Sequence, residues 1–120
     1  MNQNAEIENL QSRIQAFSEA RDWDQFHTPK NLIMATTAEI GELSELLQWK
    51  SDSEAAEFLA SKEGKERISE EIADVAIYLI RLCQKLDLNF IEIIKQKIEQ
   101  NNLKYPIEKS KGSAKKYTDL

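Results

Sequence analysis

This 120-residue sequence is poor in residues that cross-link a chain or turn it sharply, with one cysteine, three glycines and two prolines. A single cysteine cannot form a disulfide within the chain. Cys83 also lies among apolar neighbours, so we expect a core residue in a reducing compartment. Few glycines and prolines leave little room for loops. We see neither a leader sequence nor an apolar run near the ~20 residues of a membrane span, so we expect a cytoplasmic protein.

Basic charge is also scarce, and it is unevenly placed. The formal net charge is −5, from 16 basic and 21 acidic residues, which does not favour binding to a nucleic acid polymer. From Lys104 onward the chain is net +3, whereas the part before it is net −8. An acidic body with a basic tail suits a metal site that also holds a polyanionic ligand. A solvated, lysine-rich terminus is the simpler alternative.

Apolar residues recur at intervals of three and four, and no segment alternates as a strand would. We therefore expect an all-α fold, a four- or five-helix bundle, in a single domain. The predicted helices span residues 4–21, 29–49, 65–86 and 90–104, with a short helix begun by Ser53 and ending near Gly64. Residues 1–106 form the helical domain in this interpretation, and residues 107–120 form a basic, irregular tail.

The predicted helix 65–86 carries a long apolar segment. From Ile72 to Cys83 it is apolar on every side except at Asp74 and Arg81. A helix that is apolar all round is buried in a bundle or shared with a second subunit. We therefore expect Asp74 to be buried, where a carboxylate must be neutralised, paired or bound to metal.

Two acidic pairs predict a site. Residues three apart lie on one face of a helix, so Glu39 with Glu42, and Glu71 with Asp74, each present two carboxylates side by side. Brought face to face, the pairs would make a cluster of oxygen ligands suited to Mg²⁺. The main alternative is a buried ion-pair network that involves Arg81 or a lysine.

Aromatic residues flank these pairs. Trp23 and Trp49 are either core residues or, in a cleft, surfaces on which a nucleobase could stack. Tyr78 follows Asp74 by one helical turn and could place its hydroxyl beside the same site.

Five segments give the sequence a family resemblance: RDWDQFH (21–27), EIGELSELLQW (39–49), EEIADVAIYL (70–79), YP (105–106) and KYT (116–118). Together they closely resemble the MazG-like all-α nucleotide pyrophosphohydrolases, and within them the dCTP pyrophosphatase branch. The resemblance covers nearly the whole chain.

The resemblance implies Mg²⁺-dependent hydrolysis of a nucleoside triphosphate between the α- and β-phosphates, in a dimer or a tetramer built from tight dimers. It implies metal ligands at Glu39, Glu42, Glu71 and Asp74, base-pocket residues at Trp23 and Trp49, further substrate contacts at Tyr78 and Asn101, and a phosphate contact at Lys116. A carboxylate not fully engaged by metal, Glu42 or Glu45, would orient or deprotonate the attacking water.

Two differences from the animal dCTP-preferring enzymes bear on the expected substrate preference. Ile14 stands where those enzymes have a histidine, which weakens the expected preference for cytosine. Asn102 and Leu103 stand where those enzymes have basic residues, so binding of the triphosphate would depend more on the tail. A broad-specificity pyrophosphohydrolase, a non-catalytic nucleotide- or metal-binding module, and a purely structural helical oligomer are the alternatives.

Overall fold

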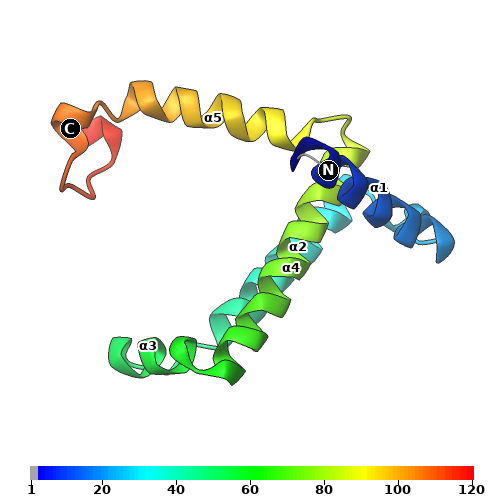
Figure 1. Cartoon of the computed structure of the whole chain (residues 1–120), viewed down its shortest axis with the longest axis horizontal. Coiled ribbons are helices and arrows are strands. Elements are labelled where there is room, and N and C mark those ends of the chain that lie inside the picture. The colour runs from blue at the N-terminus through cyan, green and yellow to red at the C-terminus, as the bar shows by residue number, and fades with distance from the viewer. Residues whose placement is uncertain (1–2) are drawn as a thin grey trace. The chain divides into compact units, whose positions relative to one another are not determined.

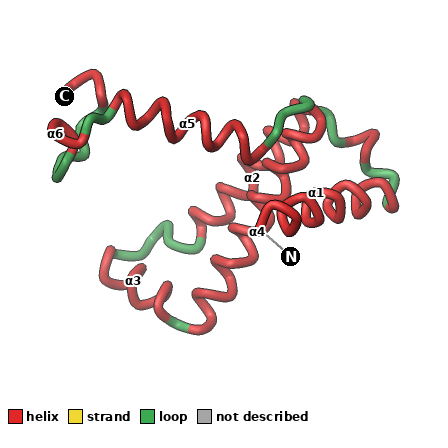
Figure 2. The backbone as a smooth tube through the Cα atoms, turned by 45° about the horizontal axis from the view of Figure 1, so that its top comes forward, coloured by secondary structure: helices red, strands yellow, loops and turns green. Residues whose placement is uncertain are grey.

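The computed structural model describes residues 3–120 and is all-α, as predicted. No strand occurs within this range, as the tube in Figure 2 shows. The helices are α1 (Gln3–Ala20), α2 (Pro29–Glu45), α3 (Asp52–Ala60), α4 (Lys62–Lys85), α5 (Phe90–Lys104) and α6 (Ile107–Ser110), with 3₁₀ turns at Asp24–Phe26 and Tyr117–Asp119. The chain divides into two compact units, one ending at Asp87 and one running from Leu88 to Leu120.

Two predicted helix starts are confirmed by their capping bonds. The Thr28 hydroxyl accepts a hydrogen bond from the backbone N–H of Asn31, and Pro29 occupies the first helical position, where a missing N–H costs nothing. The Asn89 side chain accepts one from the N–H of Glu92 at the start of α5. At its other end α2 stops at Glu45, and residues 46–49 form a turn where we expected helix.

The short helix differs from its prediction at both ends. It begins after Ser51, whose hydroxyl and the Glu54 side chain form a reciprocal capping box. It ends at Ala60, because Ser61 both terminates α3 and caps α4. Gly64 therefore lies in the first turn of α4. A Cβ atom there would lie 1.8 Å from the Phe58 carbonyl oxygen, so close packing of α3 on α4 explains this glycine.

In the first unit, α4 is the common packing partner of α1, α2 and α3. Figure 1 shows α2 and α4 side by side, with α3 at the end where α4 begins and α1 across the other end. The buried apolar residues among those described are Ile14, Leu32, Ile80 and Cys83. This core is small, and much of the apolar surface of the helices is uncovered within one chain.

The exposed surface of α4 corrects one expectation. Ile72 and Ile77 are 55% and 43% exposed, and Asp74 is exposed as well. The prediction that Asp74 is buried is therefore wrong for the single chain, because α1, α2 and α3 cover only part of α4.

The second unit contains α5, α6 and the last 3₁₀ turn. Part of the tail that we expected to be irregular is helical, since α6 begins directly after Pro106. The rings of Tyr105 and Tyr117 meet edge to face at 6.0 Å, and the Lys104 ammonium lies 4.9 Å from the centre of the Tyr117 ring. These contacts hold the end of the tail against the end of α5.

Within residues 3–120, no helix has the length and apolar character needed to cross a membrane.

Candidate active site

Three of the predicted metal ligands converge between α2 and α4. Glu39 and Glu42 on α2 and Glu71 on α4 each offer a carboxylate oxygen, and the three oxygens lie within 4.8 Å of one another. Glu39 Oε2 and Glu71 Oε2 are buried and have no hydrogen-bond partner. Unpaired buried carboxylate oxygens are costly, and a hard divalent cation is the ligand that satisfies them best. The cluster therefore fits a divalent metal.

The electrostatics of Glu39 reflect this crowding. Burial raises the pKa of its carboxyl group from 4.5 to about 7, assisted by the adjacent Glu71 carboxyl group and by the negative charges of Glu42 and Asp74. Without a cation, the cluster keeps a proton near neutral pH.

Asp74, the fourth predicted ligand, lies three residues beyond Glu71 on α4 and outside the three converging carboxylates. Its charge nevertheless contributes to the raised pKa of Glu39. It also lines a neighbouring cavity. Asp74 therefore connects the acidic cluster to that cavity.

The cavity lies between α1, the 3₁₀ turn and α4, and has a volume of about 520 Å³, within the range of small-molecule sites. Its apolar wall consists of Leu10, Ile14, Phe17, Trp23 and Ile77. Its polar lining consists of Arg13, Ser18, His27, Asp74, Tyr78 and Arg81. The rings of Phe17 and Trp23 meet edge to face at 5.7 Å, which makes an aromatic surface suited to a flat ring. Trp23, Tyr78 and Asp74, all predicted site residues, thus line one cavity.

The ion pairs of residues 3–120 do not involve the acidic cluster. Arg81 pairs with Asp24, and Lys85 Nζ lies 2.9 Å from the same Asp24 carboxylate oxygen. The predicted alternative, in which Arg81 or a lysine neutralises the acidic pairs, is therefore wrong in this structure. The cluster remains anionic and free to take a cation.

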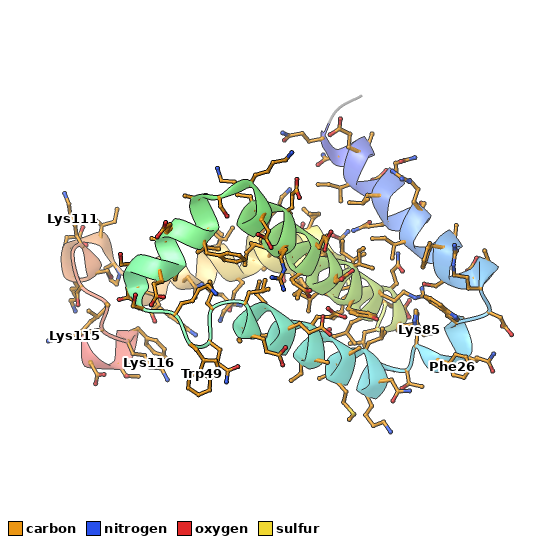
Figure 3. All side chains as sticks on the ribbon, turned by 90° about the horizontal axis from the view of Figure 1, so that it is seen from below. Phe26, Trp49, Lys85, Lys111, Lys115 and Lys116 are labelled. Carbon is orange, nitrogen blue, oxygen red and sulfur yellow. The ribbon has the colours of Figure 1, made fainter. Side chains whose placement is uncertain are left out.

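Trp49 lies apart from the cavity that Trp23 lines. It follows α2, whereas Trp23 precedes it, and this 17-residue helix is about 25 Å long. Trp49 is 89% exposed. Figure 3 shows its ring pointing away from the ribbon, at the end of the first unit opposite to Phe26 and Lys85.

The two remaining predicted contacts belong to the second unit. Asn101 lies in the last turn of α5, and Lys116 directly precedes the final 3₁₀ turn. Figure 3 shows Lys116 together with Lys111 and Lys115 on the tail.

Comparison with known proteins identifies the family. A model of the MazG-like family matches residues 34–120, a range that includes the three converging carboxylates, Asp74 and the tail. The chain belongs to the MazG-like family.

Relatives of this MazG-like chain include dCTP pyrophosphatases and a pyrophosphatase of known structure. It is 40% identical over 114 residues to dCTP pyrophosphatase 1 of Mus musculus and 36% identical to that of Homo sapiens, covering 95% of this chain and 67% of either relative. A crystal structure of a pyrophosphatase from Archaeoglobus fulgidus superimposes with a TM-score of 0.78 at 42% identity, covering 84% of this chain and 93% of that one.

The sequence did not reveal several residues that line the cavity of the MazG-like chain. Phe17 and Ser18 fall on α1, where helical spacing identifies a face but not a ligand site. His27 and Arg81 lie 54 residues apart, and their contact depends on the packing of the 3₁₀ turn against α4. The available signals were Arg81 itself, a charged residue in an otherwise apolar stretch, and the RDWDQFH segment that contains His27.

The pKa of Glu39 predicts that divalent metal binds this MazG-like chain more tightly as the pH rises to about 7. The raised pKa means that Glu39 is protonated below that value, and a cation must displace this proton, so affinity should fall by up to about tenfold per pH unit below 7. Titration calorimetry with Mg²⁺ between pH 5.5 and 8.5, in buffers of different ionisation enthalpy, would measure both affinity and proton release. Glu39→Gln should bind more weakly and lose this pH dependence, whereas a pH-independent wild type would contradict the prediction.

Proposed function

We propose that this chain is a nucleotide pyrophosphohydrolase that uses Mg²⁺ to hydrolyse nucleoside triphosphates between the α- and β-phosphates, with dCTP or a related pyrimidine deoxynucleotide as the preferred substrate. The observation that carries the proposal is an acidic cluster joined through Asp74 to an aromatic cavity. A nucleotide has the same two parts, an anionic phosphate chain and a flat base. The relatives at 36–40% identity are dCTP pyrophosphatases, which agrees with this arrangement.

Each part of the site has a role in the proposed reaction. The base enters the cavity and packs against Trp23, and the Tyr78 hydroxyl lies on the same lining. Glu39, Glu42, Glu71 and Asp74 would hold the cation. When bound, Mg²⁺ supplies neutralisation of phosphate charge and orientation of the phosphate oxygens. Asn101 remains a proposed substrate contact, and Lys116 remains a proposed phosphate contact.

The chemical step requires a base among the carboxylates. Water attacks the α-phosphorus, a new P–O bond forms, and the bond from the α-phosphorus to the bridging oxygen breaks to release pyrophosphate. The proton lost by the water passes to a carboxylate, for which Glu42 or Glu45 is proposed. Glu45 ends α2 one turn after Glu42, so both lie on the same helix face.

One observation favours a broader substrate range as the second candidate. Ile14 is buried in the cavity wall, where it offers a base no hydrogen bond. Recognition at that point would therefore depend on shape and apolar contact, which discriminate between bases less sharply than paired polar groups do.

The test is pyrophosphate release from canonical and 5-modified nucleoside triphosphates, with Mg²⁺ and with chelator, by wild type and Glu42→Gln. Activity confined to dCTP-like substrates and lost with chelator would support the full proposal. Broad activity would support the second candidate. Calorimetric binding without release would favour a non-catalytic module, and neither binding nor release would contradict the function.

The same proposal includes a homo-oligomer, a dimer or a dimer of dimers, in which two copies complete each site. Exposed apolar residues on α2 (Ile33, Met34, Ile40) and α4 (Ile72, Ile77) supply the surface that a second copy would cover. Trp49 cannot reach the cavity of its own chain across the length of α2. We therefore propose that Trp49 closes the base pocket of a second copy.

Mixing subunits tests this arrangement. Trp23→Ala and Trp49→Ala should each raise KM by about ten- to a hundredfold, because stacking on an aromatic contributes ~1–3 kcal/mol per base. If Trp49 acts on a second copy, a randomly reassembled mixture of the two variants contains about a quarter of intact sites and regains activity accordingly. A mixture no more active than the mean of the separate variants would place both tryptophans in sites of one chain. Light scattering would establish that the mixed subunits assemble.

A further inference from the structure

Arg81 organises the polar floor of the cavity. It is only 3% exposed and is held by three partners on three different nitrogens. Its Nε–H donates to His27 Nδ1 at 3.0 Å, one terminal nitrogen donates to Gln84 Oε1 at 3.0 Å, and the other bonds to the Asp24 carboxylate. The guanidinium thereby ties α4 to the turn that follows Trp23.

The bond to His27 fixes the protonation of its ring. Arginine has donors and no acceptor, so His27 Nδ1 must present its lone pair. The imidazole is then neutral, and its proton is on Nε2. Burial and the Arg81 charge also hold the pKa of His27 below its ordinary value of 6.5, in agreement with the geometry.

The network has a defined direction of donation. Gln84 Nε2 donates to the Gln11 carbonyl oxygen at 2.8 Å, which leaves Gln84 Oε1 to accept from Arg81. Asp24 is an acceptor that also receives Lys85. Every partner of Arg81 is therefore a hydrogen-bond acceptor. The planar guanidinium donates to all three acceptors at once.

We propose that Arg81 is a positioning residue for base recognition, which holds His27 as the Nε2–H tautomer so that this N–H donates to an acceptor on the base edge. The 2-carbonyl oxygen and N3 of cytosine are acceptors of this kind. His27 and Ile14 line the same cavity, so His27 supplies a polar contact that Ile14 cannot. The inference rests on the proposed function, because it assigns the cavity to a base.

The tautomer can be measured directly, because the chain has one histidine. In an untagged, ¹⁵N-labelled protein without nucleotide, long-range ¹H–¹⁵N correlation spectra should show the wild-type imidazole neutral at pH 7 with the proton on Nε2. Arg81→Lys keeps a cation for Asp24 but lacks the fork, so it should show a mixture of tautomers and a higher His27 pKa. The matched control is Lys85→Met, which removes the other partner of Asp24 but not the Arg81 bond to His27. It should leave the neutral ring protonated on Nε2, with a higher His27 pKa because the Lys85 charge is lost.

Kinetics would connect the tautomer to recognition. His27→Ala and Arg81→Lys should each raise KM for the best substrate about tenfold, the value of one good hydrogen bond, with kcat within about twofold. The double variant should be no worse than His27→Ala alone, because Arg81 acts through His27. Additive losses would contradict the inference.

The two proposals fail in different ways. A wild-type ring that is charged or protonated on Nδ1 at pH 7, or an Arg81→Lys variant with unchanged spectra and KM, would overturn the role of Arg81 alone. If Arg81→Lys does not fold, the wild-type spectrum and the KM of His27→Ala still decide. A wild type that hydrolyses no nucleotide would overturn the proposed function while the spectra still report the tautomer.

Discussion

Replacing Glu71 by glutamine is expected to lower kcat/KM for nucleotide hydrolysis by about a thousandfold, or ~4 kcal/mol, the scale of charge stabilisation that a catalytic cation supplies. Glu71 is the contribution of α4 to the converging cluster, and its Oε2 is buried without a partner. The amide keeps the shape of the side chain but removes the charge that a cation requires. Initial rates at saturating and limiting Mg²⁺ would measure the loss.

Stability measurements separate this effect from unfolding. The amide introduced by Glu71→Gln can donate a hydrogen bond to Glu39 without carrying negative charge, so the variant should melt no lower than the metal-free wild type. Mg²⁺ should raise the melting temperature of the wild type and leave that of the variant unchanged, since only a bound ligand shifts the folding equilibrium. Glu70→Gln is the matched control, because Glu70 is the exposed neighbour outside the cluster and should retain activity. Equal activity of the two variants would contradict the assignment of Glu71.

Gly64→Ala is expected to destabilise the fold by about 2–3 kcal/mol, the upper part of the range for overpacking. The added Cβ would lie 1.8 Å from the Phe58 carbonyl oxygen and 2.6 Å from its carbon. Both are backbone atoms, so α3 must move away from α4 to make room. Urea unfolding of the metal-free protein, followed by circular dichroism, would measure the change.

Gly41→Ala is expected to have the opposite effect, an increase in stability. Gly41 lies within α2, and apart from its chain neighbours and the adjacent backbone of its own helix, nothing lies within 4 Å of where its Cβ would stand. Alanine there should stabilise the fold by roughly 0.5–1 kcal/mol, because it restricts the unfolded chain and favours helix. If both substitutions destabilise equally, the close packing of Gly64 against Phe58 is not the reason for that glycine.

The acidic pairs could be predicted from sequence because a helix places residues three apart on one face whatever surrounds it. That rule located Glu39, Glu42 and Glu71 before any packing was known. The rule could not predict that Asp74 is exposed and borders a cavity, since this depends on how much of α4 its neighbours cover. It also could not pair Arg81 with Asp24 and His27, because a contact across more than 50 residues leaves no mark in local spacing.

Helix ends, too, could be predicted where they depend on local sequence and not where they depend on contacts between helices. The helices predicted to begin at residues 29 and 90 do begin there, capped by Thr28 and Asn89, because a capping bond involves residues only three apart. Gly64 was misread as a helix end, since glycine is common there. Its actual reason is a carbonyl on another helix, which local sequence does not show.

The joint at Ser61 restricts how this sequence can change in length. Its hydroxyl donates to the Phe58 carbonyl oxygen at 2.6 Å and accepts from the N–H of Gly64 at 3.0 Å, so one residue ends one helix and starts the next. An inserted residue would break both bonds and rotate α4, and with it Glu71, by about 100°. Between α2 and α3, by contrast, residues 46–49 form a turn, and the cap of α3 at Ser51 lies beyond it. Natural insertions and deletions should therefore accumulate before Ser51 and be rare at Ser61.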